Sequence, residues 1–246
     1  MRTLKYILAR FFAFWAALVF VSTMLLVLIP IVLIGFAAEP RRSRLFQSLI
    51  QGWMTVFFVL TGVRRSFRGR EHFRKGENYV VVCNHRSYLD PPLSSPGIPT
   101  ANKTIAKAEM AKIPLFGIVY RRGSVLVNRK SEESRKASYG KMKDVLVRHG
   151  FHMCIYPEGT RNRGSETLMK FHDGAFKLAV ETGRSVIPAL LFHSEKVMPP
   201  NEGFYFWPHR VAMHFLPPVS PAGKTVAELR EEVHALMTHY LETTKA

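Results

Sequence analysis

One uninterrupted apolar run near the amino terminus constrains this chain more than any other feature. Residues 11–38 read FFAFWAALVFVSTMLLVLIPIVLIGFAA and contain no charged side chain. As a helix, the run would reach about 42 Å, against about 30 Å for the hydrocarbon core of a bilayer. It is far longer than the apolar part of a signal peptide, and the large side chain of Phe36 does not fit the small-residue pattern of a signal-peptide cleavage site before Ala38. We therefore expect this segment to remain in the protein, kink at Pro30 and enter lipid.

A second apolar segment, residues 45–63, follows at once and is amphipathic. Its polar side chains share one helical face: Gln47, Ser48, Gln51 and Thr55. Arginines also separate the two segments, at positions 41, 42 and 44, where a transmembrane hairpin would place them on the non-cytoplasmic side. We therefore favour a helix pair, residues 1–63, that lies in one leaflet, or one span plus an interfacial helix.

The net charge of +17 indicates an anionic partner. Charge alone does not choose among a phospholipid surface, a nucleic acid and a phosphate-bearing substrate. The sequence contains no nucleic-acid recognition motif, and a long apolar amino terminus argues against that partner. We expect an anionic phospholipid membrane, of the inner or plasma type, with the remaining domain on its cytoplasmic face.

The pattern from residue 64 onward alternates between strands and helices. Apolar runs predict strands near residues 79–83, 104–108, 123–128, 151–157, 185–192 and 210–216. Helical patterns occupy 131–150, 174–183 and the tail from Thr225, where Thr225 and Glu228 form a capping-box pair. The sequence therefore predicts an α/β domain over 64–246, with a mixed sheet and flanking helices, behind the membrane-binding pair.

Polar side chains follow the first of these strands in the stretch NHRSYLD, residues 84–90. A histidine is well suited to removing a proton near neutral pH, and a carboxylate on its far nitrogen fixes its tautomer. A turn stiffened by Pro91 and Pro92 would bring Asp90 back to His85. The chain has no G-x-S-x-G nucleophile elbow, so we expect the substrate to supply the attacking hydroxyl.

The stretch YPEGTR, residues 156–161, follows another predicted strand and suits a phosphate. Gly159 and Thr160 can offer backbone amides, and Arg161 is a planar cation that binds phosphate in a bidentate manner. Glu158 would either anchor Arg161 or bind substrate hydroxyls. Arg129 and Lys107 add positive charge at neighbouring strand ends.

Taken in order, these stretches resemble the four motifs of the glycerophospholipid acyltransferases, particularly the lysophosphatidate (1-acyl-glycerol-3-phosphate) acyltransferases. NHRSYLD matches the first motif, RGSVLVNR (122–129) the second, YPEGTR the third and VIPA (186–189) the fourth. The resemblance covers about residues 79–190. Two departures, Tyr156 for Phe and Asn128 for a frequent Asp, remove no charged participant.

The resemblance implies a role for each matched residue. His85 would deprotonate the free hydroxyl of the acceptor, and Asp90 would orient His85. Arg129, Arg161 and Lys107 would hold the phosphate. Gly123, Glu158 and Gly159 would shape the acceptor site, and Pro188 would line the acyl side. The donor would be acyl-CoA or acyl-carrier protein, with no cofactor and no metal.

Three alternatives stay open at this point. Cys83 could form an acyl-enzyme with His85, although nothing visible in the sequence lowers its pKa. The acceptor could be another lyso-lipid, such as a lyso-aminolipid. The chain could also be a non-catalytic basic module that docks on membranes. A metal site at His149 and His152 is disfavoured because no third ligand has useful spacing, and we expect both to be surface histidines.

Overall fold

A computed structural model describes residues 2–128 and 130–244 of the chain. Its helices are α1 (Arg2–Ile34), α2 (Arg41–Leu60), α3 (Asp90–Gly97), α4 (Phe116–Gly123), α5 (Glu132–Val147), α6 (Gly174–Thr182), α7 (Ser194–Val197) and α8 (Val226–Thr243), with short 3-10 turns η1 (Arg70–His72) and η2 (Ala108–Lys112). Its strands are β1 (Arg64–Arg68), β2 (Val80–Cys83), β3 (Asn102–Lys107), β4 (Ser124–Val127), β5 (His152–Ile155), β6 (Val186–Phe192) and β7 (Arg210–Phe215).

The strands form one seven-stranded sheet in the order β1-β7-β6-β2-β5-β3-β4. The five strands from β6 to β4 run parallel, whereas β7 is antiparallel to β6 and β1 runs parallel to β7. The predicted mixed α/β sheet is therefore confirmed. Strand β1 was not anticipated, because its sequence RRSFR has a single large apolar residue.

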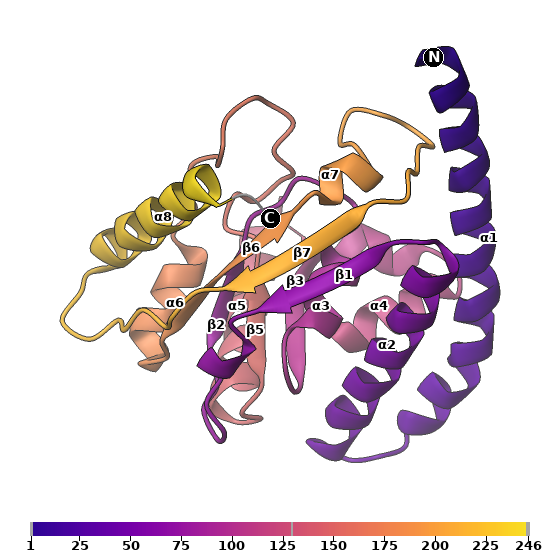
Figure 1. Cartoon of the computed structure of the whole chain (residues 1–246). Coiled ribbons are helices and arrows are strands. Elements are labelled where there is room, and N and C mark those ends of the chain that lie inside the picture. Colours follow the sequence, from indigo (N-terminus) through magenta and orange to yellow (C-terminus); the bar gives the residue numbers. More distant parts are fainter. Residues whose placement is uncertain (1, 129, 245–246) are drawn as a thin grey trace.

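Two hydrophobic clusters lie on opposite faces of the sheet. Alternate residues of β2 point to opposite faces: Val81 and Cys83 join a cluster with α1 to α4, and Val80 and Val82 join a cluster with α5, α6 and α8. Because the parallel strands are buried on both faces, they read as continuous apolar runs rather than alternating ones. The sheet is thus a rigid layer between two groups of helices (Figure 1).

The two amino-terminal helices pack on each other and against the sheet domain. Helix α1 continues through Pro30 and runs along one side of the molecule, with α2 beside its carboxyl-terminal half (Figure 1). The two glutamines of the polar face of α2 contact the domain, whereas Ser48 and Thr55 are exposed: Gln47 is buried and donates to the Ser95 carbonyl at 2.7 Å, and Gln51 donates to the Pro96 carbonyl at 3.4 Å. These contacts provide donors to carbonyls in the last turns of α3.

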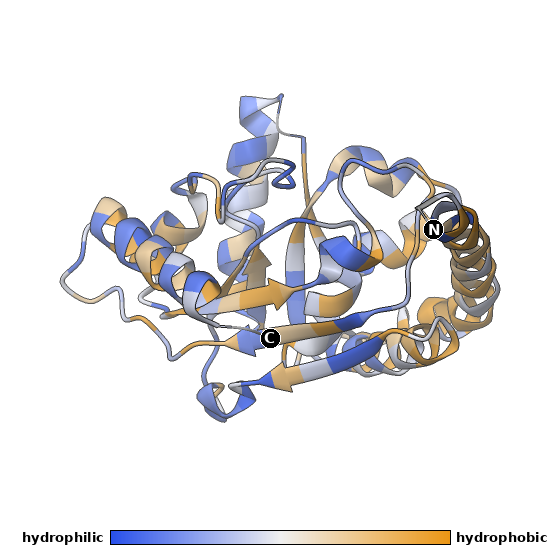
Figure 2. Cartoon of the chain, turned by 45° about the horizontal axis from the view of Figure 1, so that its top comes forward, coloured by the Kyte–Doolittle hydropathy of each residue, from blue (hydrophilic) through white to orange (hydrophobic). Residues whose placement is uncertain are grey.

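The opposite face of α1 is apolar and exposed. Side chains at helical spacing project from it, including Leu4, Phe11, Phe14, Leu18 and Leu26, and each of these is between 48% and 74% exposed. Figure 2 shows α1 as the most continuously hydrophobic element of the fold. Among the described residues, α1 is the one helix long and apolar enough to cross a membrane, by length and composition alone.

Two helix ends follow the expected capping. Thr225 and Glu228 form the predicted capping box at the start of α8, with the Glu228 amide donating to Thr225 Oγ1 at 3.2 Å. Helix α6 ends at Gly183, which has a positive φ of 64°. Helix α5 ends at Val147, the amides of Arg148 and His149 both donate to the Asp144 carbonyl, and the chain then turns at the expected Gly150, which has a positive φ of 65°.

Candidate active site

The carboxyl end of β2 carries the histidine–aspartate pair. Asp90 is the first residue of α3, so the turn between β2 and α3 returns its carboxylate to His85: Nδ1 of His85 lies 2.7 Å from Oδ2 of Asp90. The two prolines occupy the first turn of α3, where a missing N–H costs nothing. Because a carboxylate only accepts, Nδ1 carries the hydrogen and Nε2 keeps a lone pair for a substrate proton.

Asp90 is fully buried and also organises the turn itself. Its Oδ2 accepts from the backbone amides of Arg86 at 2.7 Å and Ser87 at 2.8 Å. Oδ1 has no hydrogen-bond partner in the described part of the chain. One oxygen therefore fixes both the histidine ring and the loop that carries it.

The side chain of Tyr156 packs against the imidazole of His85. Its ring stacks on the ring of His85, with centroids 4.4 Å apart and an interplanar angle of 29°. The Tyr156 hydroxyl lies 2.6 Å from Ser94 Oγ in α3, and burial raises the pKa of that hydroxyl well above its usual value. Tyr156 thus stays neutral and holds the ring between α3 and the end of β5. The sequence showed only that it replaces Phe.

The Glu158 carboxylate connects the loop after β2, which carries His85, with the loop after β5. Oε1 accepts from the His85 amide at 2.7 Å, and Oε2 accepts from the Met169 amide at 3.0 Å. Burial raises the pKa of Glu158, against the lowering effect of these two amides. Glu158 is 2% exposed, so it holds backbone rather than presenting a carboxylate outward, a role that the sequence did not indicate.

Two asparagines complete the support of His85, and neither was singled out in the sequence. Asn84 pairs with Leu191 of β6 through both amide atoms, at 2.7 and 3.0 Å, in the manner of a strand continuation. The Asn162 amide donates to the His85 carbonyl at 2.7 Å. An asparagine at the point where an apolar strand ends was the available signal.

The loop after β5 turns tightly at Gly159. Its φ is 69°, and a Cβ there would lie 2.8 Å from Cδ2 of His172, so a side chain is excluded on both counts. The Gly159 amide donates to the Tyr156 carbonyl at 3.0 Å and is therefore occupied within the turn, contrary to our expectation that it is offered to phosphate. Thr160 is exposed at the tip of this loop.

Arg161 reaches across to the other loop. Its guanidinium carbon lies 3.4 Å from the ring centroid of Tyr88, which belongs to the turn between His85 and Asp90. Nη1 of Arg161 is shielded from solvent and has no hydrogen-bond partner among the described residues. The site thus holds a guanidinium against the turn that joins His85 to Asp90, stacked on Tyr88 and not paired with a carboxylate that the structure describes.

The remaining expected residues lie at different positions along their strands. Lys107 ends β3 at the carboxyl edge, the edge that carries His85, and it is exposed. Gly123 precedes β4, at the opposite end of that strand, and a Cβ there would lie 3.2 Å from Phe46 of α2. The structure therefore does not bring Gly123 beside His85. Pro188 is buried within β6, paired with Val82. Arg129 lies outside the described residues.

The structure disfavours the cysteine alternative. Cys83 is fully buried, with its sulfur 3.8 Å from that of Cys154, and this contact together with burial raises its pKa well above the usual value. A buried thiol of raised pKa is a poor nucleophile.

His152 is not a surface residue, contrary to expectation. It stacks on Tyr79, accepts from the Tyr79 amide at 3.1 Å, and contacts Thr100 Oγ1 at 3.0 Å. His152 is the first residue of the buried strand β5, and its burial follows from its contacts with Tyr79 and Thr100, which the sequence does not indicate. The described residues contain no group of three or more side chains suited to a metal.

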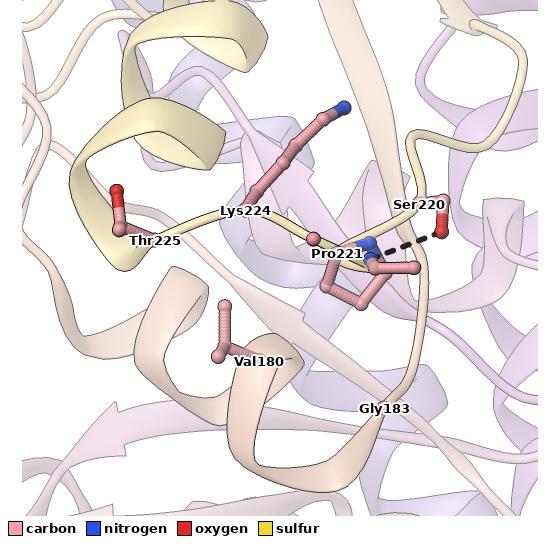
Figure 3. Close-up of a pocket in the computed structure, with 8 residues that line it drawn as sticks. Val180, Gly183, Ser220, Pro221, Lys224 and Thr225 are labelled. Carbon is pink, nitrogen blue, oxygen red and sulfur yellow. Dashed lines mark hydrogen bonds between the residues drawn. The ribbon is translucent and has the colours of Figure 1, made fainter.

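One shallow hollow of the described surface lies away from these residues. It has a volume of about 530 Å³ and is lined by the end of α6 and the segment before α8, with Val180, Gly183, Lys224 and Thr225 around it (Figure 3). It contains no histidine and no carboxylate among its lining residues. The candidate site is therefore defined by the convergence of two loops at His85 and not by cavity size.

Comparison with known proteins agrees with this arrangement. A family model described as Acyltransferase matches residues 64–191, which is more than half of the chain and includes both loops. The chain belongs to the Acyltransferase family. The match begins at β1 and ends in β6, so it contains His85, Asp90 and the whole 156–161 loop.

Relatives within this family carry more specific names. The 1-acyl-sn-glycerol-3-phosphate acyltransferase alpha of Mus musculus is 30% identical over 188 residues, covering 74% of this chain and 66% of that protein. The 1-acyl-sn-glycerol-3-phosphate acyltransferase of Borreliella burgdorferi is 32% identical over 152 residues, covering 61% of this chain and 60% of that protein. The alignments thus span about two thirds of these acyltransferases or less.

A solved acyltransferase structure shares the fold over its full length. The crystal structure of the 1-acyl-sn-glycerophosphate acyltransferase PlsC from Thermotoga maritima superposes with a TM-score of 0.81, covering all of both chains, at 23% sequence identity. This likeness includes the amino-terminal helices as well as the sheet domain.

Proposed function

We propose that this acyltransferase transfers a fatty acyl group from a thioester to the free sn-2 hydroxyl of 1-acyl-glycerol-3-phosphate, forming phosphatidic acid. The observation that carries the proposal is the buried Asp90 carboxylate on Nδ1 of His85, 2.7 Å away, which prepares Nε2 to accept a proton. The names of the relatives support the same reaction class and acceptor.

The chemistry is a direct transfer in one encounter. Nε2 of His85 takes the hydroxyl proton as the acceptor oxygen attacks the thioester carbonyl carbon. A new ester C–O bond forms and the C–S bond breaks. The imidazolium returns its proton to the leaving sulfur, which departs as the free thiol. Asp90 stabilises that imidazolium, and the protein itself forms no covalent intermediate. Positioning and general-base catalysis together carry the reaction.

The acceptor phosphate is assigned to the cations at the carboxyl edge of the sheet. Arg161 supports this assignment best, because it lies on the loop that also braces His85 through Glu158. Lys107 stands at the same edge, and Arg129 follows the neighbouring strand. The donor is acyl-CoA or acyl-carrier protein, and the reaction needs no cofactor because the substrate supplies the nucleophile and the thioester supplies the energy.

Membrane attachment is assigned to residues 1–63, with residues 64–246 as the catalytic part. Support comes from the exposed apolar face of α1, which runs along the side of the domain and not away from it (Figure 1), and from the net charge of +17. A helix held against the domain in this way suits burial in one leaflet of an anionic membrane. The proposed location is the cytoplasmic face of an inner or plasma membrane.

An acceptor panel tests the assignment. Purified protein in mixed micelles is assayed on lysophosphatidate, other lysophospholipids and a lyso-aminolipid, each with acyl-CoA and with acyl-carrier protein as donor. We expect the highest kcat/KM on lysophosphatidate. A higher value on a lyso-lipid without a phosphomonoester would contradict the proposed acceptor, and the absence of transfer to every acceptor would contradict the enzymatic assignment.

A further inference from the structure

Tyr88 is an exposed aromatic residue in the middle of the catalytic turn. Its neighbours Ser87 and Leu89 are buried, at 0% and 1% exposure, whereas Tyr88 is 62% exposed. Hydrophobic burial therefore does not explain a tyrosine at this position. Its described contact is with the guanidinium of Arg161, at 3.4 Å from the ring centroid.

This contact leaves Arg161 in an unusual state. The aromatic ring covers one flat face of the guanidinium, so the N–H groups, which lie in the plane of the guanidinium, point past the ring. Nη1 is shielded from solvent without a hydrogen-bond acceptor among the described residues, and no acidic side chain pairs with Arg161 in that part of the chain. An arginine held by stacking in this way keeps its in-plane donors for an anion.

Backbone and side-chain hydrogen bonds also tie together the two loops that meet here. The backbone amide of Asn162 donates to the His85 carbonyl at 2.7 Å, and the guanidinium of Arg86 donates to the Gly164 carbonyl at 3.3 Å. Across this junction the ring of Tyr88 faces the guanidinium of Arg161, just as the ring of His85 faces that of Tyr156. The orientation of the guanidinium relative to His85 thus depends on the ring of Tyr88.

We propose that Tyr88 is a positioning residue that sets the preference for a phosphomonoester acceptor, by stacking on Arg161 and aiming its in-plane N–H groups at the phosphate. This inference rests on the proposed function. Tyr88 acts through Arg161 and takes no part in the proton transfer at His85. Its loss weakens acceptor binding and leaves the chemical step largely unchanged.

The test separates binding from turnover. The ligand is an acyl-propanediol phosphate, which has the acyl chain and phosphate of lysophosphatidate but no attacking hydroxyl, and its Kd is measured in mixed micelles. We expect Tyr88→Leu to raise the Kd about 3- to 10-fold and Tyr88→Phe to stay within about twofold of the wild type, because Phe keeps the stacked ring. The corresponding monoacyl-propanediol, which lacks the phosphate, should bind both variants alike.

A matched control and a cycle complete the test. Tyr139 on α5 lies under Lys143 and Lys177, away from the site, so Tyr139→Leu removes a tyrosine in the same kind of contact and should leave the Kd unchanged. In an Arg161→Ala background, Tyr88→Leu should have no further effect. Equal Kd values for the Leu and Phe variants, or an undiminished effect without Arg161, would overturn the proposal. Wild-type protein that binds the analogue but does not acylate lysophosphatidate would instead refute the proposed function.

Discussion

Replacing Asp90 by Asn isolates the charge of the buried carboxylate. The amide oxygen of Asn can take the place of Oδ2 and accept from His85 Nδ1 and from the amides of Arg86 and Ser87. The amide NH₂ group then occupies the position of Oδ1, which has no partner in the described structure. The turn and the histidine tautomer are therefore preserved, and what is lost is the negative charge beside the ring.

The size of the loss follows from the geometry. With Nδ1 and Oδ2 at 2.7 Å, the centres of the two charges lie about 4 Å apart, and an effective dielectric constant of about 20 gives about 4 kcal/mol for the imidazolium–carboxylate pair. The amide dipole retains part of this, which leaves about 2–4 kcal/mol. Asp90→Asn should therefore lower kcat about 30- to 1,000-fold.

The assay is steady-state acylation of lysophosphatidate, accompanied by the Kd of acyl-propanediol phosphate. Acceptor binding should stay within about threefold of the wild type, since Asp90 is buried behind the ring. In a His85→Ala background, Asp90→Asn should cost little more, because the two residues act as one unit. A variant with kcat within threefold of the wild type would show that the Asp90 charge does not stabilise the imidazolium, and so would a loss that appears only in acceptor affinity.

Three further predictions concern two buried side chains and one constrained glycine. His152→Phe tests acid stability: burial lowers the pKa of His152 to about 4 from an ordinary 6.5, so its contribution is complete above pH 6.5 and is lost as pH falls toward 4, when only the unfolded chain takes up the proton. Urea unfolding should show the wild type losing up to about 3 kcal/mol more than the variant over that range, and equal losses would contradict this. Cys83→Ala should keep kcat within about threefold, because the buried thiol takes no part in transfer, and a loss beyond a hundredfold would revive the acyl-enzyme. Gly159→Ala should lower the free energy of unfolding by about 1–2 kcal/mol and reduce kcat/KM, since the left-handed φ and the contact with His172 displace the loop of Arg161, and an unchanged Tm with unchanged kcat/KM would contradict this.

The elements with strong patterns could be predicted from the sequence. Apolar runs located β2, β5 and β6, and the Thr225–Glu228 pair located the start of α8, because each is determined by residues close together in the chain. Strand β1 escaped because its partner β7 lies far along the chain and its own residues are mostly arginine. Pairing of that kind is a tertiary property that a local pattern does not encode.

The candidate site divides in the same way. The return of Asp90 to His85 follows from a short turn within one motif. The stacking of Tyr156 on His85 and the hydrogen bond from the His85 amide to Glu158 both join loops that are more than 70 residues apart in the chain. Only the parallel pairing of β2 with β5 brings these loops together. Gly123 matched a motif but lies at the amino end of β4, whereas His85 follows the carboxyl end of β2. The order of the motifs along the chain does not determine at which end of a strand a residue lies.

The proposed role of His85 as the general base is tested most directly by kcat of His85→Ala, measured with saturating lysophosphatidate and acyl-CoA in mixed micelles. If His85 is the general base, kcat should fall about 10²- to 10⁴-fold, with the Kd of acyl-propanediol phosphate within about threefold of the wild type. A His85→Ala protein that retains more than a tenth of the wild-type kcat would contradict this role.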